Sequence, residues 1–278
     1  MALAGPLVPA ASAAAQTTTT TVAPGYWLAT ANGHVYGLGG AGSFGGFPVT
    51  TATGDVSGIA GTPSAKGYWV VTQAGNVSKH GSDISFYGDP PGLGKHISNI
   101  VAMAATSDGK GYYLLGSDGG LFTFGDARYY GSVPAQGIHV HNIAGRAVTP
   151  GDGGYLMVGF DGGVFTFGNA KFYGSLPGMG KHVDNIRGIF ASSAGTGYAM
   201  VGSDGGVFNF GTGIKYYGSL PEIGVKTSII VGMAITPDDG GYWMAGADGF
   251  VHGFGNAKLE PTPPGLQSNL PVVAVAGT

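Results

Sequence analysis

Three histidines recur along the chain at a constant interval, which makes them the first candidates for chemistry. His139 follows His96 by 43 residues, and His182 follows His139 by 43 residues. Imidazole can bind a metal ion, contact a glycan or change its charge near neutral pH. A tight turn does not require imidazole, so the repetition indicates a ligand-binding role. Duplication of one ancestral loop residue would give the same pattern without a function, and Lys226 takes the equivalent place in the next unit.

Aspartates followed by glycine form a second repeated set. Its members are Asp118, Asp161, Asp204 and Asp248, with Asn32 in the equivalent place of the first unit and Ala74 in that of the second. Two-residue hairpin turns favour Asp-Gly pairs, because these residues adopt the positive φ angles that such turns require. The aspartates therefore have a structural explanation. They remain candidate ligand-binding residues because we expect their turns to share one face with the histidine loops.

The segments that carry these residues repeat with the same period. Six units begin with a glycine, an aromatic residue and a short apolar run, at Gly25, Gly67, Gly111, Gly154, Gly197 and Gly241. A period of 42 to 44 residues with short strands and many turn glycines is typical of a β-propeller with one blade per repeat. We therefore predict an all-β fold, a six-bladed β-propeller over residues 25–278.

Each blade is predicted to have four antiparallel strands. In the third unit these are residues 101–106, 111–116, 121–124 and 128–130. The first unit begins at its second strand, and residues 271–276 form a first strand with nothing after it. We predict that this C-terminal strand joins the N-terminal blade and closes the ring, which removes an exposed sheet edge. An open array of six units is the alternative.

Two arginines interrupt the apolar segments that we expect to line the central channel. Arg146 lies in AGRAV and Arg187 in IRGIF, whereas the equivalent segments are mostly small and aliphatic. An arginine on an inner strand must reach water or pair with a carboxylate, because an unpaired buried charge is costly. These residues therefore predict either an anion site in the channel or a cap at one of its ends.

The three tryptophans have a simpler interpretation. Exposed indoles can stack on sugar rings, but Trp27, Trp69 and Trp243 share one place in the Gly-Tyr-Trp strand. We expect them in the core between blades.

Composition restricts the partners and the chemistry. The chain has 12 basic and 15 acidic residues and a net charge of −3, so no basic field suits a nucleic acid. It has no cysteine, which excludes disulfides and thiolate metal sites. No segment reaches the roughly 20 apolar residues of a membrane span. Motifs for a nucleophile elbow, a zinc helix or a phosphate loop are absent, and no cofactor or metal site is predicted.

Residues 1–24 are expected to lie outside the propeller. Residues 2–15 are small and apolar and end in three alanines, and residues 17–21 are all threonine. This pattern is typical of the end of a secretory signal peptide followed by a threonine-rich leader, although the positive start of a signal is missing. A disordered alanine-rich tail is the alternative. We predict a secreted or surface-associated protein.

The repeat resembles a family of secreted actinobacterial proteins. Gly-Tyr-Trp or Gly-Tyr-Tyr is followed by Ser-Asp-Gly-Gly-Val-Phe, then Phe-Gly-Asp-Ala, and closes on Tyr-Tyr-Gly-Ser. Residues 111–132, 154–175 and 197–219 show this best, and the resemblance covers residues 25–278. It implies a secreted, propeller-like module of a kind that often accompanies cell-wall hydrolases. It implies no catalytic residues, because no catalytic motif belongs to the repeat.

Three functions compete on these observations. The first is a non-catalytic propeller that binds carbohydrate or a cell-surface polymer through equivalent loops, where many weak sites act together. The second is a structural or adhesive scaffold whose partner is another extracellular protein. The third is a polysaccharide hydrolase or lyase with carboxylates from separate blades at the channel mouth. The candidate ligand-binding residues are the three histidines, the four aspartates and the two arginines.

Overall fold

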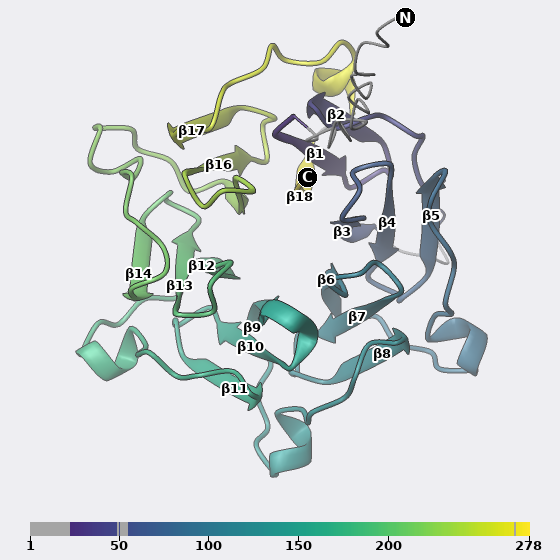
Figure 1. The fold of residues 1–278 in the computed structure, drawn as a ribbon, viewed down its shortest axis with the longest axis horizontal. Coiled ribbons are helices and arrows are strands. Elements are labelled where there is room, and N and C mark those ends of the chain that lie inside the picture. The colour runs from purple at the N-terminus through teal and green to yellow at the C-terminus, as the bar shows by residue number, and fades with distance from the viewer. Residues whose placement is uncertain (1–22, 49, 51–54, 270) are drawn as a thin grey trace, which may run out of the picture.

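The computed structural model describes residues 23–48, 50, 55–269 and 271–278. In these residues the chain is all-β, with six three-stranded antiparallel sheets and short 3-10 turns in the loops. Figure 1 shows the six sheets placed around a central axis, which is a propeller-like arrangement. The predicted leader lies almost wholly outside the described residues. Among the described residues, no helix could span a bilayer, and the only helices are single 3-10 turns.

Each sheet has an inner, a middle and an outer strand. The inner strands are β3 (Val56–Gly61), β6 (Ile100–Ala105), β9 (Ile143–Val148), β12 (Ile186–Ala191), β15 (Ile230–Ile235) and β18 (Val272–Gly277). The middle strands are β1 (Gly25–Thr30), β4 (Gly67–Thr72), β7 (Gly111–Gly116), β10 (Gly154–Gly159), β13 (Gly197–Gly202) and β16 (Gly241–Gly246). The outer strands are β2 (Val35–Gly39), β5 (Val77–Gly81), β8 (Leu121–Gly125), β11 (Val164–Gly168), β14 (Val207–Gly211) and β17 (Val251–Gly255).

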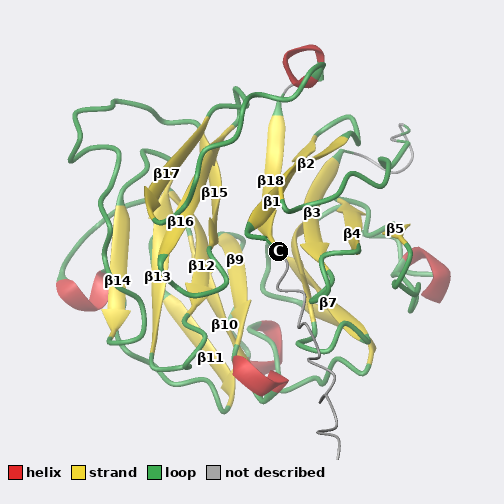
Figure 2. Ribbon diagram, turned by 45° about the horizontal axis from the view of Figure 1, so that its top comes forward, coloured by secondary structure: helices red, strands yellow, loops and turns green. Residues whose placement is uncertain are grey.

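The 3-10 turns lie in the connections, outside the strands (Figure 2). They are η1 (Pro91–Leu93), η2 (Pro134–Gln136), η3 (Pro150–Asp152), η4 (Pro177–Met179) and η5 (Leu266–Ser268). Three of them, η1, η2 and η4, follow the outer strands of consecutive sheets and end at a glycine in the left-handed region. They therefore occupy equivalent places in the repeat.

The core lies between neighbouring sheets. Every residue of the six middle strands is buried, because each sheet is covered on both faces and its central strand meets no water. Aromatic rings fill these interfaces. The ring centres of Trp69 on β4 and Tyr112 on β7 lie 5.5 Å apart, and those of Trp27 on β1 and Tyr68 on β4 lie 5.6 Å apart. With Trp243 only 1% exposed, the prediction that the tryptophans are core residues is confirmed.

The two ends of the repeat meet in one sheet. Strand β18 pairs with β1 in antiparallel register from Tyr26 opposite Gly277 to Thr30 opposite Val272. The C-terminal strand thus joins the N-terminal blade, as the sequence predicts. Tyr26 also lies 5.1 Å from Trp243 on β16, so this sheet packs against the last complete unit in the same manner as the other neighbours do.

The predicted fourth strand is wrong: the blades have three strands. Residues 128–130 instead belong to a connection without regular secondary structure, to which a tyrosine of the next blade bonds. The backbone N–H of Tyr130 donates to the Tyr155 hydroxyl at 3.0 Å, and that hydroxyl donates to the carbonyl of Gly131 at 2.5 Å. Equivalent bonds join Tyr87 to Tyr112 and Tyr217 to Tyr242. The Tyr130 N–H and the Gly131 carbonyl are thus bonded to the next blade and not to the outer strand.

Candidate functional site

The three predicted histidines lie in exposed loops directly after η1, η2 and η4. His96, His139 and His182 are all exposed. Backbone bonds hold each loop: in the η4 loop the Gly180 N–H donates to the Pro177 carbonyl and the Lys181 N–H to the Leu176 carbonyl, both at 2.9 Å. Leu176 is fully buried and anchors this loop. The imidazoles are therefore carried by loops with a defined backbone.

The histidine loops and the aspartate turns share one face, as predicted. The Ser117 N–H in the Asp118 turn donates to the Asn99 carbonyl at 2.9 Å, and the Ile143 N–H donates to the Ser117 carbonyl at 3.0 Å. The turn of one blade is thus bonded both to its own entry loop and to the entry loop of the next blade. The same pattern recurs at Phe160 and Ser203.

The four aspartates act as turn residues. The Asp118 carboxylate accepts the Gly120 N–H at 2.9 Å, Asp161 and Asp204 accept the equivalent bonds at 2.9 Å, and Asp248 accepts the Phe250 N–H at 3.1 Å. Only the glycine of each pair has a positive φ angle, 75° to 80°. These are therefore three-residue loops with a left-handed glycine, not the two-residue turns expected from Asp-Gly. The structural explanation of these aspartates is confirmed.

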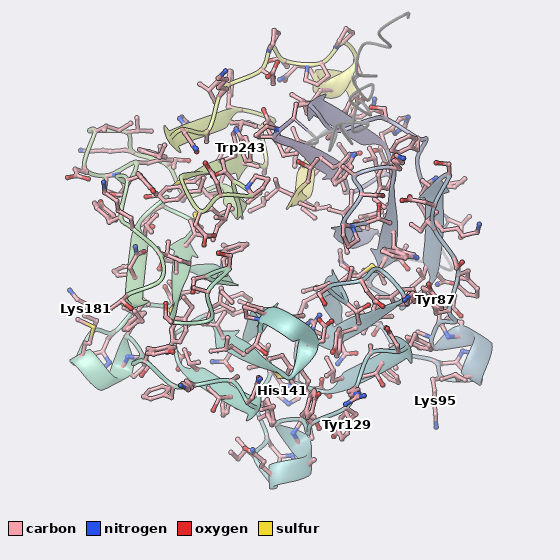
Figure 3. All side chains as sticks on the ribbon, viewed as in Figure 1. Tyr87, Lys95, Tyr129, His141, Lys181 and Trp243 are labelled. Carbon is pink, nitrogen blue, oxygen red and sulfur yellow. The ribbon has the colours of Figure 1, made fainter. Side chains whose placement is uncertain are left out.

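The loops do not converge on one site. In Figure 3, Lys95 and Lys181, the neighbours of His96 and His182, lie on opposite sides of the outer rim. Within the described residues, no three His, Asp or Glu side chains come close enough together to hold a metal ion. The histidine positions are thus separate and equivalent, which suits repeated weak contacts with a long ligand and does not suit one deep pocket.

Apolar side chains on the same loops are functional candidates that the sequence reasoning missed. Leu93, Met179 and Ile223 follow equivalent prolines and are 62%, 62% and 60% exposed. Exposed aromatic residues precede the same loops: Phe86, Tyr129, Phe172 and Tyr216. The signal was available in the sequence, because each lies at a fixed repeat position where the fold offers no cover.

Carboxylates gather between the third and fourth blades, as a hydrolase site with carboxylates from separate blades would require. A cavity of about 380 Å³ is lined by Asp108, Asp126 and Asp152. Hydrogen bonds from Lys110 lower the pKa of Asp108 to about 2, whereas a general acid needs a raised pKa. The Asp152 carboxylate accepts hydrogen bonds from both the backbone N–H and the hydroxyl of Ser107 in the neighbouring blade. These carboxylates hold turns together.

The central axis contains a small cavity built from the inner strands. Each inner strand has an irregular register that leaves its second residue unpaired. These six residues all line one cavity of about 120 Å³: Ser57, Val101, Ala144, Arg187, Val231 and Val273. Equivalent fourth residues line it too: Ile59, Met103, Arg146, Ile189, Met233 and Val275. Two arginines thus interrupt two otherwise uncharged rings.

Arg146 is buried at this cavity with few partners. Its side chain is 7% exposed, and its guanidinium lies 4.2 Å from the centre of the Tyr113 ring. One nitrogen donates to the Ala104 carbonyl at 3.3 Å, while the Nε and Nη1 atoms have no partner in the protein. Burial lowers the pKa of Arg146 to about 10, so the group stays charged at neutral pH. The carboxylate pairing that the sequence left open is not formed.

Arg187 is half-buried at the same cavity. Its guanidinium lies 5.2 Å from the centre of the Phe160 ring and donates to the Ile186 carbonyl at 3.4 Å. Both arginines therefore place their charge against an aromatic ring, and neither forms a salt bridge. Comparisons with known proteins add no assignment: no protein-family model matches the chain, and no curated protein matches it significantly.

Proposed function

We propose that this chain is a six-bladed propeller of three-stranded blades whose ring is closed by β18, and that it is a secreted, non-catalytic module that binds carbohydrate or another cell-surface polymer. The observation that carries the proposal is the set of exposed, backbone-fixed loops with histidine at equivalent places around the rim. A polymer of repeated units matches such an array, because several weak contacts act together once the first is made.

The exposed side chains on these loops have the chemistry that a sugar polymer needs. Aromatic rings such as Tyr129 and Phe172 are 52% and 58% exposed and offer stacking faces, and imidazoles offer hydrogen bonds to hydroxyl groups. The resemblance to secreted actinobacterial repeats supports an envelope polymer as the source of the ligand.

The test compares a polymer with its fragments. The chain is titrated with a panel of purified glycans and bacterial envelope polymers, and any polymer that binds is cut to short oligosaccharides. We expect the intact polymer to bind at least about tenfold more tightly than the fragments, as multivalency requires. The triple variant H96A/H139A/H182A should lose most of this binding. The matched control is H141A. His141 is an exposed histidine of the η2 loop, and the equivalent places in the neighbouring units hold no histidine.

Normal binding by the triple variant would show that the histidine loops are not the site. A scaffold role is the second candidate, and the exposed apolar residues Leu93, Met179 and Ile223 favour it, because exposed apolar patches mark protein interfaces. Sedimentation that depends on concentration without any sugar, and that is abolished by L93S/M179S/I223S, would support the scaffold instead.

A further inference from the structure

The axial cavity is lined by two arginines, and no acidic side chain in the described part of the chain lies beside them to balance their positive charge. No acidic side chain is present among the described residues that line it or among those of the adjoining axial cavity of about 420 Å³, to which Arg146 also contributes. A buried cation is normally paired, because removal from water costs several kcal/mol. Waters can satisfy N–H groups, but they do not neutralise the charge.

The positive charges in the cavity wall suit an oxyanion. Guanidinium N–H groups form a planar fork that fits two oxygens of a phosphate or carboxylate. Here the Tyr113 ring lies against one face of the Arg146 guanidinium, and the unpartnered Nε and Nη1 atoms are buried in the cavity wall, so Arg146 acts on the cavity through its uncompensated charge. Arg187 on the next inner strand adds a second positive charge to the same walls. Low-dielectric walls strengthen the attraction of both for an anion.

The inner strands β9 and β12 approach each other closely beside the cavity. A Cβ atom on Gly145 of β9 would lie 3.1 Å from the Cα of Gly188 on β12, so glycine at both places permits this approach. A volume of about 120 Å³ has room for several waters, and therefore for an ion of phosphate size. It has no room for a polymer.

We propose that the axial cavity binds a small oxyanion, held by the uncompensated positive charges of Arg146 and Arg187. Phosphate, sulfate and a carboxylate share the required chemistry, and the experiment separates them. This site is independent of the rim loops, so it can exist whether or not the polymer-binding proposal holds.

The test is titration calorimetry of the full chain with inorganic phosphate, sodium sulfate and sodium acetate at constant ionic strength. Saturable binding of at least one is expected, and the anion that binds most tightly identifies the chemistry of the ligand. R146M keeps much of the side-chain volume and removes the charge, so the affinity should fall about 10-fold or more. R187M should lower it about 3- to 10-fold.

The matched control is R128M, because Arg128 is exposed and lies outside the two axial cavities. It removes the same unit of charge, so a general effect of net charge would lower binding in R128M as well. R146K retains the charge without the fork and should bind with intermediate affinity, which also covers a failure of R146M to fold. No saturable binding of any of the three anions, or equal losses in R128M and R187M, would overturn the proposal.

Discussion

Equivalent positions of the repeat lie far apart on the outer rim and close together around the central axis. His96 and His182 occupy the same place in their units, yet their neighbours lie on opposite sides of the molecule (Figure 3). Met103, Arg146 and Met233 also occupy one repeat position, and they line a single cavity. A binding site on the rim therefore recurs only in those units that repeat its residues. At the axis, a single unit with a different residue changes the chemistry of the one cavity that all six units share.

This difference explains why the two candidate sites have opposite sequence signatures. At the rim the repeated histidines are the informative residues. At the axis the informative residues are those that break the pattern, because a ring of six similar strands places one unlike side chain opposite five uncharged ones. A ligand with many equivalent units suits the first arrangement, and a single small ion suits the second.

Tyrosine hydroxyls bond neighbouring blades to each other throughout the fold. We expect alkali to break these bonds, because it deprotonates the hydroxyls. Burial raises the pKa of Tyr112, Tyr155 and Tyr242 to about 12, above the value near 10 of an unfolded chain. The folded state therefore holds these protons more tightly, and their stabilising effect is complete below pH 10. It should be lost as the pH rises from about 10 to 12. Urea midpoints measured against pH, with phenolate absorbance, check this; a flat profile to pH 12 would contradict it.

A matched pair of arginine substitutions should separate axis from rim. Met233 is fully buried beside the axis, and Met179 is 62% exposed. M233R adds a third positive charge to the cavity wall that Arg146 and Arg187 already line, and it should lower the free energy of unfolding by about 3–5 kcal/mol. M179R should change it by less than about 0.5 kcal/mol. Urea unfolding of both variants is the measurement, and equal losses would show that the two environments do not differ.

Because the rim loops lie apart from one another, substitutions in different loops should have additive effects on the free energy of unfolding. Gly94, Gly137 and Gly180 have φ angles of 69°, 74° and 70°, and an added Cβ would meet no atom within 4 Å at any of them. Each change to alanine should therefore cost only the backbone strain of a left-handed residue, about 1 kcal/mol. The triple variant should lose the sum, because distant sites without shared partners are additive. Unfolding curves of the three single variants and the triple variant test this, and marked non-additivity would show that the loops are coupled.

Much of the fold could be predicted from residue types and spacing. The period located all six middle strands, because glycine, aromatic and apolar residues recur where both faces of a sheet are covered. The pairing of β18 with β1 followed from the unit that lacks a first strand. The fourth strand could not be assigned correctly, because Arg128, Tyr129 and Tyr130 have strand-like character. The partner of the Tyr130 N–H is instead the Tyr155 hydroxyl of the next blade.

The candidate sites show the same division. The sequence alone determined the repeat, the turn role of Asp-Gly, the burial of the tryptophans and the two arginines as exceptions on inner strands, since all of these depend on local spacing and side-chain chemistry. Only the tertiary structure decided that Arg146 has no carboxylate beside it and that the histidine loops remain apart. Distances between units depend on how six sheets pack around an axis, and no residue within a single unit contains that information.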